Sequence, residues 1–452
     1  MLRTTGKAAS GLSCANTEAL NLSFSDRPIE THPSSRNSKK SFLFVIAHLG
    51  PGGAQRVVVN AANALVERGF DVHVTILGHQ PIVYWVDPRV TFHSSSPVQA
   101  AFPAPAAVPA DVEDDQMVAP ADDFDSPTKP DGWLATYVKP YLPPRVLAFG
   151  LKVAGPVFSL IWQGRRTIWL RRTIRKIEPD AVLSFLTQTN ILTVLATRGL
   201  ATRTVISERN DPRLQRHRAR VERLRHIVYP WADVVTANSR GALTALESFV
   251  PKRKLAYLPN PLGAVPTDEA VAFTAPTVIT VGRLVEQKGV DVLLAAWAKV
   301  VAALPDWRLA LVGGGPLAGE LKEQARKLGI DGSIDWIGHV SDPFPLLRGA
   351  KIFVMTSRFE GTPNALLEAM ACGLPTVISD ASPGPCELIG DGEEASGLIV
   401  PVEDADATAE AIICLARDES LRRHLGLASR ERARAHDADH AIDVWLRLLR
   451  CE

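Results

Sequence analysis

One stretch of the sequence decides the fold: Arg358-Phe359-Glu360-Gly361-Thr362-Pro363-Asn364-Ala365-Leu366-Leu367-Glu368-Ala369-Met370-Ala371-Cys372-Gly373-Leu374-Pro375. It predicts a short helix with recognisable ends. Thr362 is of the type that caps a helix N-terminus, and Pro363 suits the first helical position because its missing N–H costs nothing there. Gly373 is placed to end the helix, since glycine readily adopts the left-handed conformation that follows a last turn.

The same stretch sets two carboxylates on either side of the helix start. Glu360 falls on the loop and Glu368 within the helix. The free backbone N–H groups of the first turn, from Asn364 and Ala365 onward, attract anions. A sugar attached to a diphosphate therefore fits between the two carboxylates. The alternative is that Glu360 caps the turn and Glu368 lies on an ordinary exposed helix face.

Composition bounds the class of protein. A chain of 452 residues is longer than one domain with a single hydrophobic core, so we expect two domains and terminal tails. The formal net charge of +1 argues against a dedicated nucleic-acid binder. Five scattered cysteines without metal-ligand spacing favour a reducing cytoplasm. Residues 1–40 are polar and Ser-rich and lack the apolar core of a signal peptide, so we expect a disordered tail.

Short apolar runs alternate with helical patterns along most of the chain, which is typical of doubly wound α/β domains. A strand at 41–47, a glycine-rich loop, a helix at 54–67 and a strand at 72–77 open the first such region and predict a parallel sheet. A proline-rich linker at 258–263 ends it. A strand at 277–281 opens the second region.

Three segments of the first region have unusual composition. Residues 94–130 are rich in Pro, Ala and Asp and are expected to form a flexible insertion. The apolar run 146–162 is too short to span a membrane, and a cationic run follows it with Arg165, Arg166, Arg171, Arg172, Arg175 and Lys176. This pair predicts either a helix lying on an anionic membrane surface or a core helix with a solvated basic side. Further arginines lie between 209 and 225, on a helix expected from about Pro212 that would spread them over several faces. Most would then face solvent; the alternative is that some bind an anionic lipid headgroup or a lipid diphosphate.

Glu360 and Glu368, with the glycines and prolines around them, resemble the E-x7-E signature of retaining glycosyltransferases of family four, which have the GT-B fold. Four further segments resemble parts of that family: 48–56, 281–289, 311–316 and 336–340. Ser207-Glu208-Arg209-Asn210-Asp211-Pro212 resembles a subset that extends lipid-linked oligosaccharides or polysaccharides. These motifs cover roughly residues 42–425, and together they are far more specific than any one glycine loop.

The resemblance implies an α/β GT-B fold, in which two doubly wound Rossmann-like domains face a cleft. We expect an N-terminal acceptor-binding domain at 41–262 and a C-terminal nucleotide-sugar-binding domain at 263–425. Residues 426–452 would form a helix that packs back on the N-terminal domain.

The resemblance also implies a donor site. Glu368 would accept hydrogen bonds from the nucleotide ribose, and Glu360 would contact sugar hydroxyls near the reacting carbon, because an ionised carboxylate is a pure acceptor. His339 would only form part of the pocket wall. The other expected donor-binding residues are Gly52, Gly53, Gly338, Val340, Pro363, Asn364 and Ala365.

Arg283 and Lys288 follow a predicted strand at its carboxyl end, where open α/β sheets bind ligands. Sugar transfer from a nucleotide diphosphate leaves negative charge on two phosphates, and these cations would stabilise it, with Glu360 completing the catalytic set. The alternative is that both are surface residues of a strand loop. Since the cations replace a metal ion, we expect a metal-independent reaction with no cofactor.

The acceptor side is less defined by the sequence. His48, Glu208 and Arg209 are candidates, each as a positioning group rather than a base, because the leaving phosphate can itself take the acceptor proton. The expected partners are a UDP- or GDP-linked sugar, a glycan or lipid-linked acceptor and an anionic membrane surface, and not nucleic acid. The expected role is transfer of a hexose or N-acetylhexosamine in cell-surface polysaccharide or glycoconjugate synthesis, at the cytoplasmic face of the membrane.

Other functions are compatible with parts of this pattern. A nucleotide-sugar epimerase would share the GT-B fold. A phosphorylase would need a cofactor lysine in a motif near the C-terminus, and no lysine stands in such a motif there. A nicotinamide dehydrogenase would need the motif G-x-G-x-x-G after the first strand, and residues 50–53 lack that spacing. An inactive membrane-associated binding module is the non-enzymatic alternative, and turnover of a nucleotide sugar would exclude it.

Overall fold

The computed structural model describes residues 39–50, 52–78, 82–94, 163–215, 217–263, 273–392 and 395–449. These residues fall within one compact unit, Lys39–Glu452. The expected tail at 1–40, the insertion at 94–130 and the apolar run at 146–162 lie outside the described residues, apart from Lys39, Lys40 and Ser94.

The N-terminal half contains a sheet of seven parallel strands, whose order differs from the order in the chain. In space the order is β3 (Thr91–Ser94), β2 (Asp71–Ile76), β1 (Ser41–Ile46), β4 (Ala181–Phe185), β5 (Arg203–Glu208), β6 (Val234–Ala237) and β7 (Leu255–Tyr257). The central strands are nearly continuous apolar runs and are buried on both faces, as parallel sheets require. The chain turns back beside β1, which is the switch point where ligands bind in such sheets.

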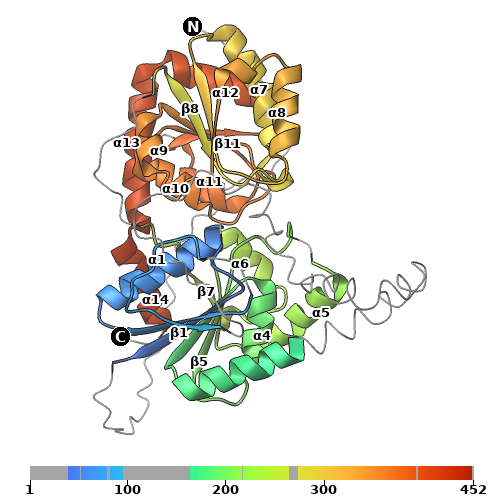
Figure 1. Ribbon diagram of the computed structural model, residues 1–452, viewed down its shortest axis with the longest axis vertical. Helices are drawn as coiled ribbons and strands as arrows, with labels where there is room; N and C mark the ends of the chain where they lie inside the picture. The colour runs from blue at the N-terminus through green and yellow to red at the C-terminus, as the bar shows by residue number, and fades with distance from the viewer. Residues whose placement is uncertain are drawn as a thin grey trace, which may run out of the picture. The chain divides into compact units, whose positions relative to one another are not determined.

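Helices cover both faces of this sheet (Figure 1). On one face lie α1 (Gly53–Glu67) and the last helix of the chain, α14 (Ala438–Leu448). The other face carries helix 163–177, α4 (Thr187–Thr197), α5 (Ala219–Val228) and α6 (Arg240–Leu246). Short 3₁₀ turns occupy Tyr229–Trp231 (η3) and Lys252–Lys254 (η4).

α14 belongs to the core of the N-terminal half. The ring of Trp445 lies 6.1 Å from Phe44 and 6.0 Å from Phe185, between centroids. Its indole N–H donates to the carbonyl of Pro259 at 2.9 Å, in the segment that joins the two halves. The end of the chain thus stabilises both the first sheet and the linker.

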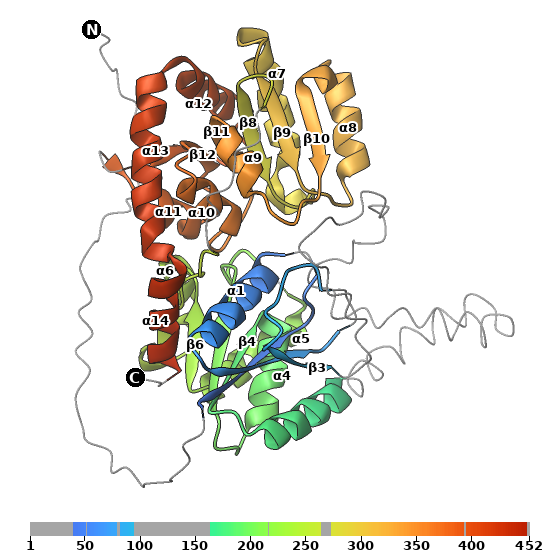
Figure 2. The same ribbon diagram turned by 60° about the vertical axis from the view of Figure 1, so that its left-hand side comes forward.

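The C-terminal half contains a six-stranded parallel sheet with helices on both faces (Figure 2). Its strand order is β10 (Ile334–Gly338), β9 (Arg308–Val312), β8 (Thr277–Val281), β11 (Ile352–Met355), β12 (Thr376–Ser379) and β13 (Gly397–Val400). One face packs against α7 (Val290–Ala303), α8 (Ala318–Lys327) and α12 (Ala405–Arg417). The other packs against α9 (Phe344–Gly349), α10 (Asn364–Ala371), α11 (Pro383–Ile389) and the end of α13 (Glu419–Ala433). Short 3₁₀ turns are η5 (Glu286–Lys288), η6 (Asp331–Ser333) and η8 (Arg434–His436).

The two ends of α10 fix the position of Glu368, which lies within this helix. The predicted Thr362 cap is wrong: Pro363 is the N-cap residue, and the Thr362 hydroxyl instead donates to the backbone carbonyl of Asn238. The predicted stop at Gly373 is confirmed. Gly373 has φ +75°, and its N–H donates to Met370 while the next N–H donates to Ala369, which satisfies the last carbonyls of the helix.

α5 begins at Ala219 and not near Pro212 as predicted. The Asp211 carboxylate accepts a hydrogen bond from the backbone N–H of Arg213 at 2.9 Å. This side-chain turn competes with helix formation and delays it.

Candidate functional site

A cleft of about 710 Å³ is lined by residues of both halves. Its walls come from the loops after the carboxyl ends of strands: His48 follows β1, Arg209 follows β5, Arg283 follows β8 and Val340 follows β10. All of the predicted site residues line this cleft except Gly338 and Glu208. The volume is ample for a small ligand.

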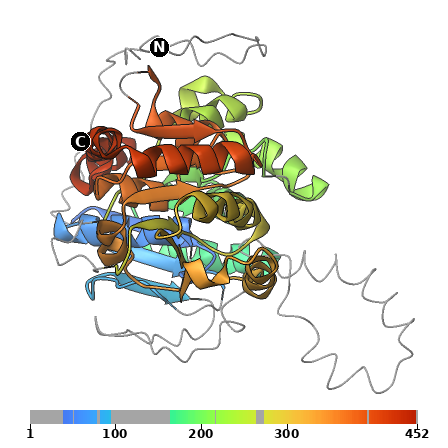
Figure 3. The same ribbon diagram turned by 90° about the horizontal axis from the view of Figure 1, so that it is seen from above.

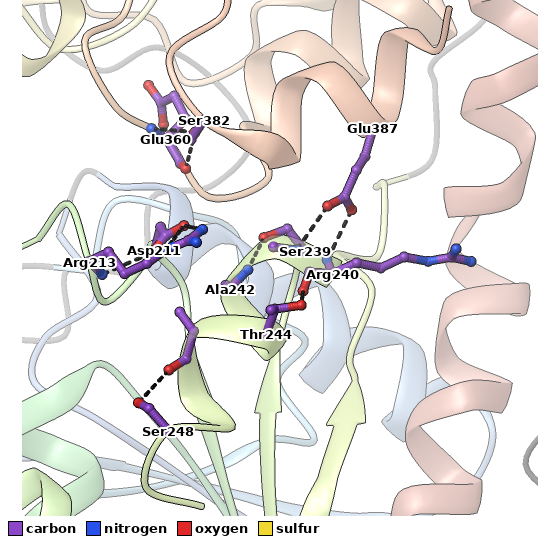
Figure 4. Close-up of polar contacts among 12 residues, drawn as sticks. Asp211, Arg213, Ser239, Arg240, Ala242, Thr244, Ser248, Glu360, Ser382 and Glu387 are labelled. Carbon is purple, nitrogen blue, oxygen red and sulfur yellow. Dashed lines mark hydrogen bonds and ion pairs between the residues drawn. The ribbon is translucent and has the colours of Figure 1, made fainter. Parts of the chain in front are cut away.

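Lys288 and Glu360 form an ion pair in the C-terminal wall of the cleft. The ammonium of Lys288, at the end of η5, meets Oε1 of Glu360, and the hydroxyl of Ser357 donates to the same oxygen at 2.8 Å. Ser382 fixes the Glu360 backbone, accepting from its N–H at 3.1 Å and donating to its carbonyl at 2.5 Å (Figure 4). Oε2 of Glu360 has no protein partner among the described residues and is available to a ligand.

The loops around this pair approach closely. Gly289, which ends η5, has φ +58°, and a Cβ there would lie 2.1 Å from the carbonyl oxygen of Thr356. A Cβ at Gly361 would lie 1.9 Å from the carbonyl oxygen of Arg209. Only glycine fits at these two positions, so both glycines are needed to place Lys288 and Glu360 where they are.

Arg283 is a half-buried cation that lines the cleft and has no partner among the described residues. It lies near His48, whose pKa is lowered to about 4 by burial and by the Arg283 charge. The imidazole is therefore neutral at pH 7, and its Nδ1 accepts from the N–H of Gly50 at 3.2 Å. An unpaired guanidinium in a cleft is suited to bind an anion.

Glu368 lies on α10 and is paired across the cleft. Its Oε1 is 3.1 Å from Nη1 of Arg56 on α1, and the residue is 5% exposed. Burial raises the pKa of Glu368, while the Arg56 charge opposes the rise. The carboxylate therefore depends on a cation that the N-terminal half supplies.

The N-terminus of α1 borders the cleft at Gly52 and Gly53. The N–H of Gly52 donates to the hydroxyl of Tyr84 at 3.0 Å, and this hydroxyl donates to the carbonyl of Gly52 at 3.1 Å. The Gly52 N–H is therefore occupied, and Gly53 and Ala54 are the first N–H donors that a ligand can reach. The side-chain amide of Asn364 also donates to the Gly53 carbonyl at 2.9 Å.

Asn260, in the linker, connects both walls of the cleft. Its amide nitrogen donates to the carbonyl of Thr362 at 2.9 Å and to the side-chain oxygen of Asn364 at 2.7 Å. Its side-chain oxygen accepts from Nη1 of Arg209 at 2.8 Å. A further contact between the halves lies outside the cleft lining: the Glu387 carboxylate accepts hydrogen bonds from the backbone N–H groups of Arg240 and Gly241 at 3.0 Å each (Figure 4).

Two of the three acceptor-side candidates line the cleft, and the third does not. Arg209 lines the cleft but is 6% exposed, with its guanidinium 4.8 Å from the Phe185 ring centroid. Burial lowers the pKa of Arg209 to about 9, so it stays charged at pH 7. Glu208 is buried in the N-terminal half, where Thr187 donates to it at 2.9 Å and the Tyr229 hydroxyl also donates to it. The structure thus brings His48 and Arg209 to the cleft and not Glu208.

Three residues of the site were not predicted. Arg56 stands in the segment 48–56, but nothing in the sequence shows that it reaches Glu368. Tyr84 and Asn260 lie in irregular segments whose roles depend on tertiary contacts. Within the part of the chain that the structure describes, no three His, Cys, Asp or Glu side chains gather in a way that could hold a metal ion.

Comparison with known proteins identifies the family. Residues 52–261 match the family described as glycosyl transferase 4-like domain, and residues 268–432 match glycosyl transferases group 1. Between them, the two matches cover most of the chain. The chain therefore belongs to the family-four type of glycosyltransferases, which are built on the GT-B fold.

Two curated relatives illustrate the family. The chain is 27% identical to an N-acetyl-D-galactosaminyltransferase of Campylobacter jejuni, named for a PP-undecaprenol-linked glycan, over 62% of this chain and 77% of the relative. It is 35% identical to the lipopolysaccharide core biosynthesis glycosyltransferase LpsE of Rhizobium meliloti, over 48% of this chain and 64% of LpsE. The chain also matches an exopolysaccharide phosphotransferase of Streptomyces coelicolor, but the match spans only 30% of the length of that protein.

A solved structure supports the fold. HepE of Anabaena, determined with UDP-glucose, superposes with a TM-score of 0.64 over 91% of this chain and 100% of HepE, at 15% identity. At that identity the likeness establishes two doubly wound domains of the GT-B type.

Proposed function

We propose that this glycosyltransferase is a retaining, metal-independent hexosyl- or N-acetylhexosaminyltransferase. It uses a UDP- or GDP-linked sugar and a glycan acceptor carried on a lipid, in cell-surface polysaccharide or glycoconjugate synthesis. The observation that carries the proposal is the group of Arg283, Lys288 and Glu360 in one cleft, in which Arg283 is unpaired and Glu360 keeps one free oxygen. The lipid-linked acceptor is supported by the printed name of the Campylobacter jejuni relative.

The donor would bind with its nucleotide against the C-terminal wall. Glu368 accepts the ribose hydroxyls, held in place by Arg56. The diphosphate lies against Arg283 and Lys288 and the first N–H groups of α10, at Asn364 and Ala365. These donors are fixed before the reaction, so they stabilise the charge that develops on the leaving diphosphate without reorganisation.

In the reaction, the bond between the anomeric carbon and the diphosphate oxygen breaks, and the acceptor oxygen forms a bond to the same face of that carbon. The acceptor proton passes to a phosphate oxygen, so no protein base is required. Glu360 holds the sugar hydroxyls beside the reacting carbon through its free oxygen. His48 is neutral and lies on the acceptor side, where it is a hydrogen-bonding group for the sugar or the acceptor.

The first experiment is a thermal-shift screen of the protein with UDP, GDP and their sugars, followed by transfer assays with the nucleotide that binds. The anomeric configuration of the product, read by NMR, tests retention: an inverted product would contradict the proposal. Formation of an epimeric nucleotide sugar without any acceptor would favour the epimerase alternative. Binding without turnover of any nucleotide sugar would favour an inactive binding module.

We also propose that the enzyme works at the cytoplasmic face of the membrane as a peripheral protein. No helix in the described parts of the chain has the length and apolarity needed to cross a bilayer. A lipid-carried acceptor nevertheless has to reach the cleft from a membrane surface. The basic helix 163–177 supports surface attachment.

A further inference from the structure

α5 exposes apolar and basic side chains on one face. Leu224 is 45% exposed and Ile227 is 56% exposed, and Arg220 and Arg223 are exposed beside them. Positions 220, 223, 224 and 227 recur at the spacing of one helical face. Trp231, in η3 directly after the helix, is 42% exposed. We call these five residues, Arg220, Arg223, Leu224, Ile227 and Trp231, the α5 patch.

Other side chains of α5 account for its attachment to the fold. Val228 is buried in the core that α5 shares with α4 and β6. Arg225 is 4% exposed and pairs with Glu222 at 2.6 Å. The exposure of the α5 patch is therefore not explained by the packing of the helix. Figures 1 and 3 show α5, in yellow-green, at the periphery of the helices of the N-terminal half.

The charge of the α5 patch is not neutralised by the protein. Arg220 and Arg223 have no acidic partner among the described residues, and Arg198 adds a further cation 4.4 Å from the Trp231 ring centroid. Exposed arginines beside Leu and Ile on one helix face, followed by an exposed Trp, are a combination that lies in the headgroup region of an anionic bilayer. The aliphatic parts and the ring enter the acyl boundary, and the guanidinium groups meet lipid phosphates.

The position of the α5 patch along the chain suits a lipid-carried acceptor. Arg209 and Asn210, which line the cleft, come directly after β5, and the following loop leads into α5. Leu214 in this loop is 44% exposed and adds one apolar side chain between the cleft residues and α5 in the sequence. A bilayer against α5 would present a headgroup-linked glycan to the acceptor side of the cleft.

Helix 163–177 offers a second basic surface that is less apolar than the α5 patch: Ile168, 54% exposed, is the large apolar side chain that it exposes. Nη1 of Arg171 donates to the carbonyls of Ala196 and Arg198 at 2.7 Å each, at the C-terminus of α4. Arg171 therefore holds the fold together and is not available to lipid. Arg165, Arg172, Arg175 and Lys176 remain exposed on this helix.

We infer that the α5 patch is the surface that docks this enzyme on an anionic lipid bilayer. The inference rests on the proposed function, because a lipid-carried acceptor gives the docking its purpose. Its test measures docking separately from donor binding, so the two can fail independently.

The experiment uses the full chain and sedimentation with vesicles of phosphatidylcholine containing phosphatidylglycerol. Wild type should bind at low salt and dissociate as salt rises, since anionic surfaces attract basic groups within a Debye length. Arg220→Gln with Arg223→Gln should weaken the partition constant about fivefold per arginine. Leu224→Asp with Ile227→Asp should weaken it by on the order of tenfold or more.

Matched controls lie in the C-terminal half. Leu427→Asp removes an apolar side chain that is 70% exposed, and Arg417→Gln removes an exposed cation. Both should bind vesicles as wild type does. All α5 variants should keep the wild-type thermal shift with UDP or GDP, whereas Glu368→Gln should bind the nucleotide on the order of tenfold more weakly and keep vesicle binding.

Wild type that does not bind the anionic vesicles at low salt would overturn the inference, and so would α5 variants that bind them like wild type. Equal loss in Leu427→Asp would show unspecific hydrophobic binding and overturn it too. If wild type binds vesicles but neither UDP nor GDP, the docking stands and the proposed donor site fails.

Discussion

Nη1 of Arg56 on α1 lies 3.1 Å from Oε1 of Glu368 on α10, so each half of the protein supplies one member of this ion pair. The expected ribose-binding carboxylate therefore keeps its ion pair only while the two halves lie close together. The ionised form of Glu368 is nevertheless destabilised in the folded protein, because burial raises its pKa more than the single cation lowers it.

The first prediction concerns Glu368→Gln. A carboxyl whose pKa is higher in the folded than in the unfolded state binds protons more tightly when folded, so stability falls as pH rises through and above the unfolded value. Removing the charge should therefore raise the Tm at pH 7, with a smaller gain at pH 4.5. Calorimetry at the two pH values measures it. Nucleotide affinity should fall on the order of tenfold, because one ribose acceptor is lost. A lower Tm at pH 7 would contradict the argument.

The second prediction separates Lys288 from Arg283. Lys288→Ala leaves the Glu360 carboxylate, which is 6% exposed, without its cation and should cost about 3 kcal/mol of unfolding free energy. Arg283→Ala removes an unpaired cation and should leave stability near wild type. Each should lower turnover by on the order of 10²-fold or more, because each removes charge from the leaving diphosphate.

The control for this pair of variants is the double change Lys288→Ala with Glu360→Gln. It should recover much of the stability lost in Lys288→Ala and none of the turnover. Urea unfolding and steady-state kinetics give the two readouts. Near-normal turnover in either single variant would remove that residue from the diphosphate site.

The third prediction is that transfer persists in excess EDTA. The proposed stabilisation of the leaving group comes from Arg283, Lys288 and helix N–H groups, so no divalent ion is required. Loss of activity in EDTA that magnesium or manganese restores would contradict it.

The fourth prediction concerns pH. His48 and His436 each have a pKa lowered to about 4, in both cases chiefly by burial. In the unfolded chain both titrate near 6.5, so stability should fall as pH drops from about 6.5 to about 4, where only the unfolded state gains protons. The Tm measured across this range, with His48→Gln as the variant that should flatten part of the fall, tests it. Since His48 is already neutral at pH 6 to 8, it should add no inflection to kcat/KM there.

Most of the fold could be predicted because buried strands and capped helices leave local signals. The strand expected at 277–281 has those bounds in the structure, and the strands expected at 41–47 and 72–77 differ from β1 and β2 by one residue at one or both ends. Thr362 does not cap α10, because its hydroxyl donates to the backbone carbonyl of Asn238, a residue more than a hundred positions earlier in the chain. No local pattern carries that information, and tertiary contact overrides the propensity.

The sequence could not show which of two neighbouring acceptor-side candidates lines the cleft, for a related reason. Glu208 and Arg209 are adjacent, and adjacent side chains at a strand end point to opposite faces. Glu208 therefore joins Tyr229 under the α4 layer, while Arg209 lies against Phe185 and Trp445 near the cleft. The motif identified the right strand end, but only the structure shows which of the two residues reaches the cleft.

The last prediction assigns Arg358 as a positioning residue. Its guanidinium donates to both carboxylate oxygens of Asp291, at 3.0 and 2.7 Å, to the carbonyl of Glu286 at 2.6 Å and to Glu403 at 2.9 Å. Its backbone N–H donates to the carbonyl of Gln287 at 2.7 Å. These bonds fasten η5, which carries Lys288, to the loop that carries Glu360.

Arg358→Lys keeps a charge but loses the planar fork that makes these bonds together. We expect kcat to fall on the order of tenfold, because the Lys288–Glu360 geometry loosens. Nucleotide affinity should fall less, since Glu368, Arg283 and α10 are not held by Arg358. Arg308→Lys is the matched control: Arg308 also makes a two-point contact with a carboxylate, that of Asp335, between strands outside the cleft lining. A similar loss of stability in both variants with loss of kcat in Arg358→Lys alone would establish positioning. An unchanged kcat in Arg358→Lys would show that η5 and the Glu360 loop are held without it.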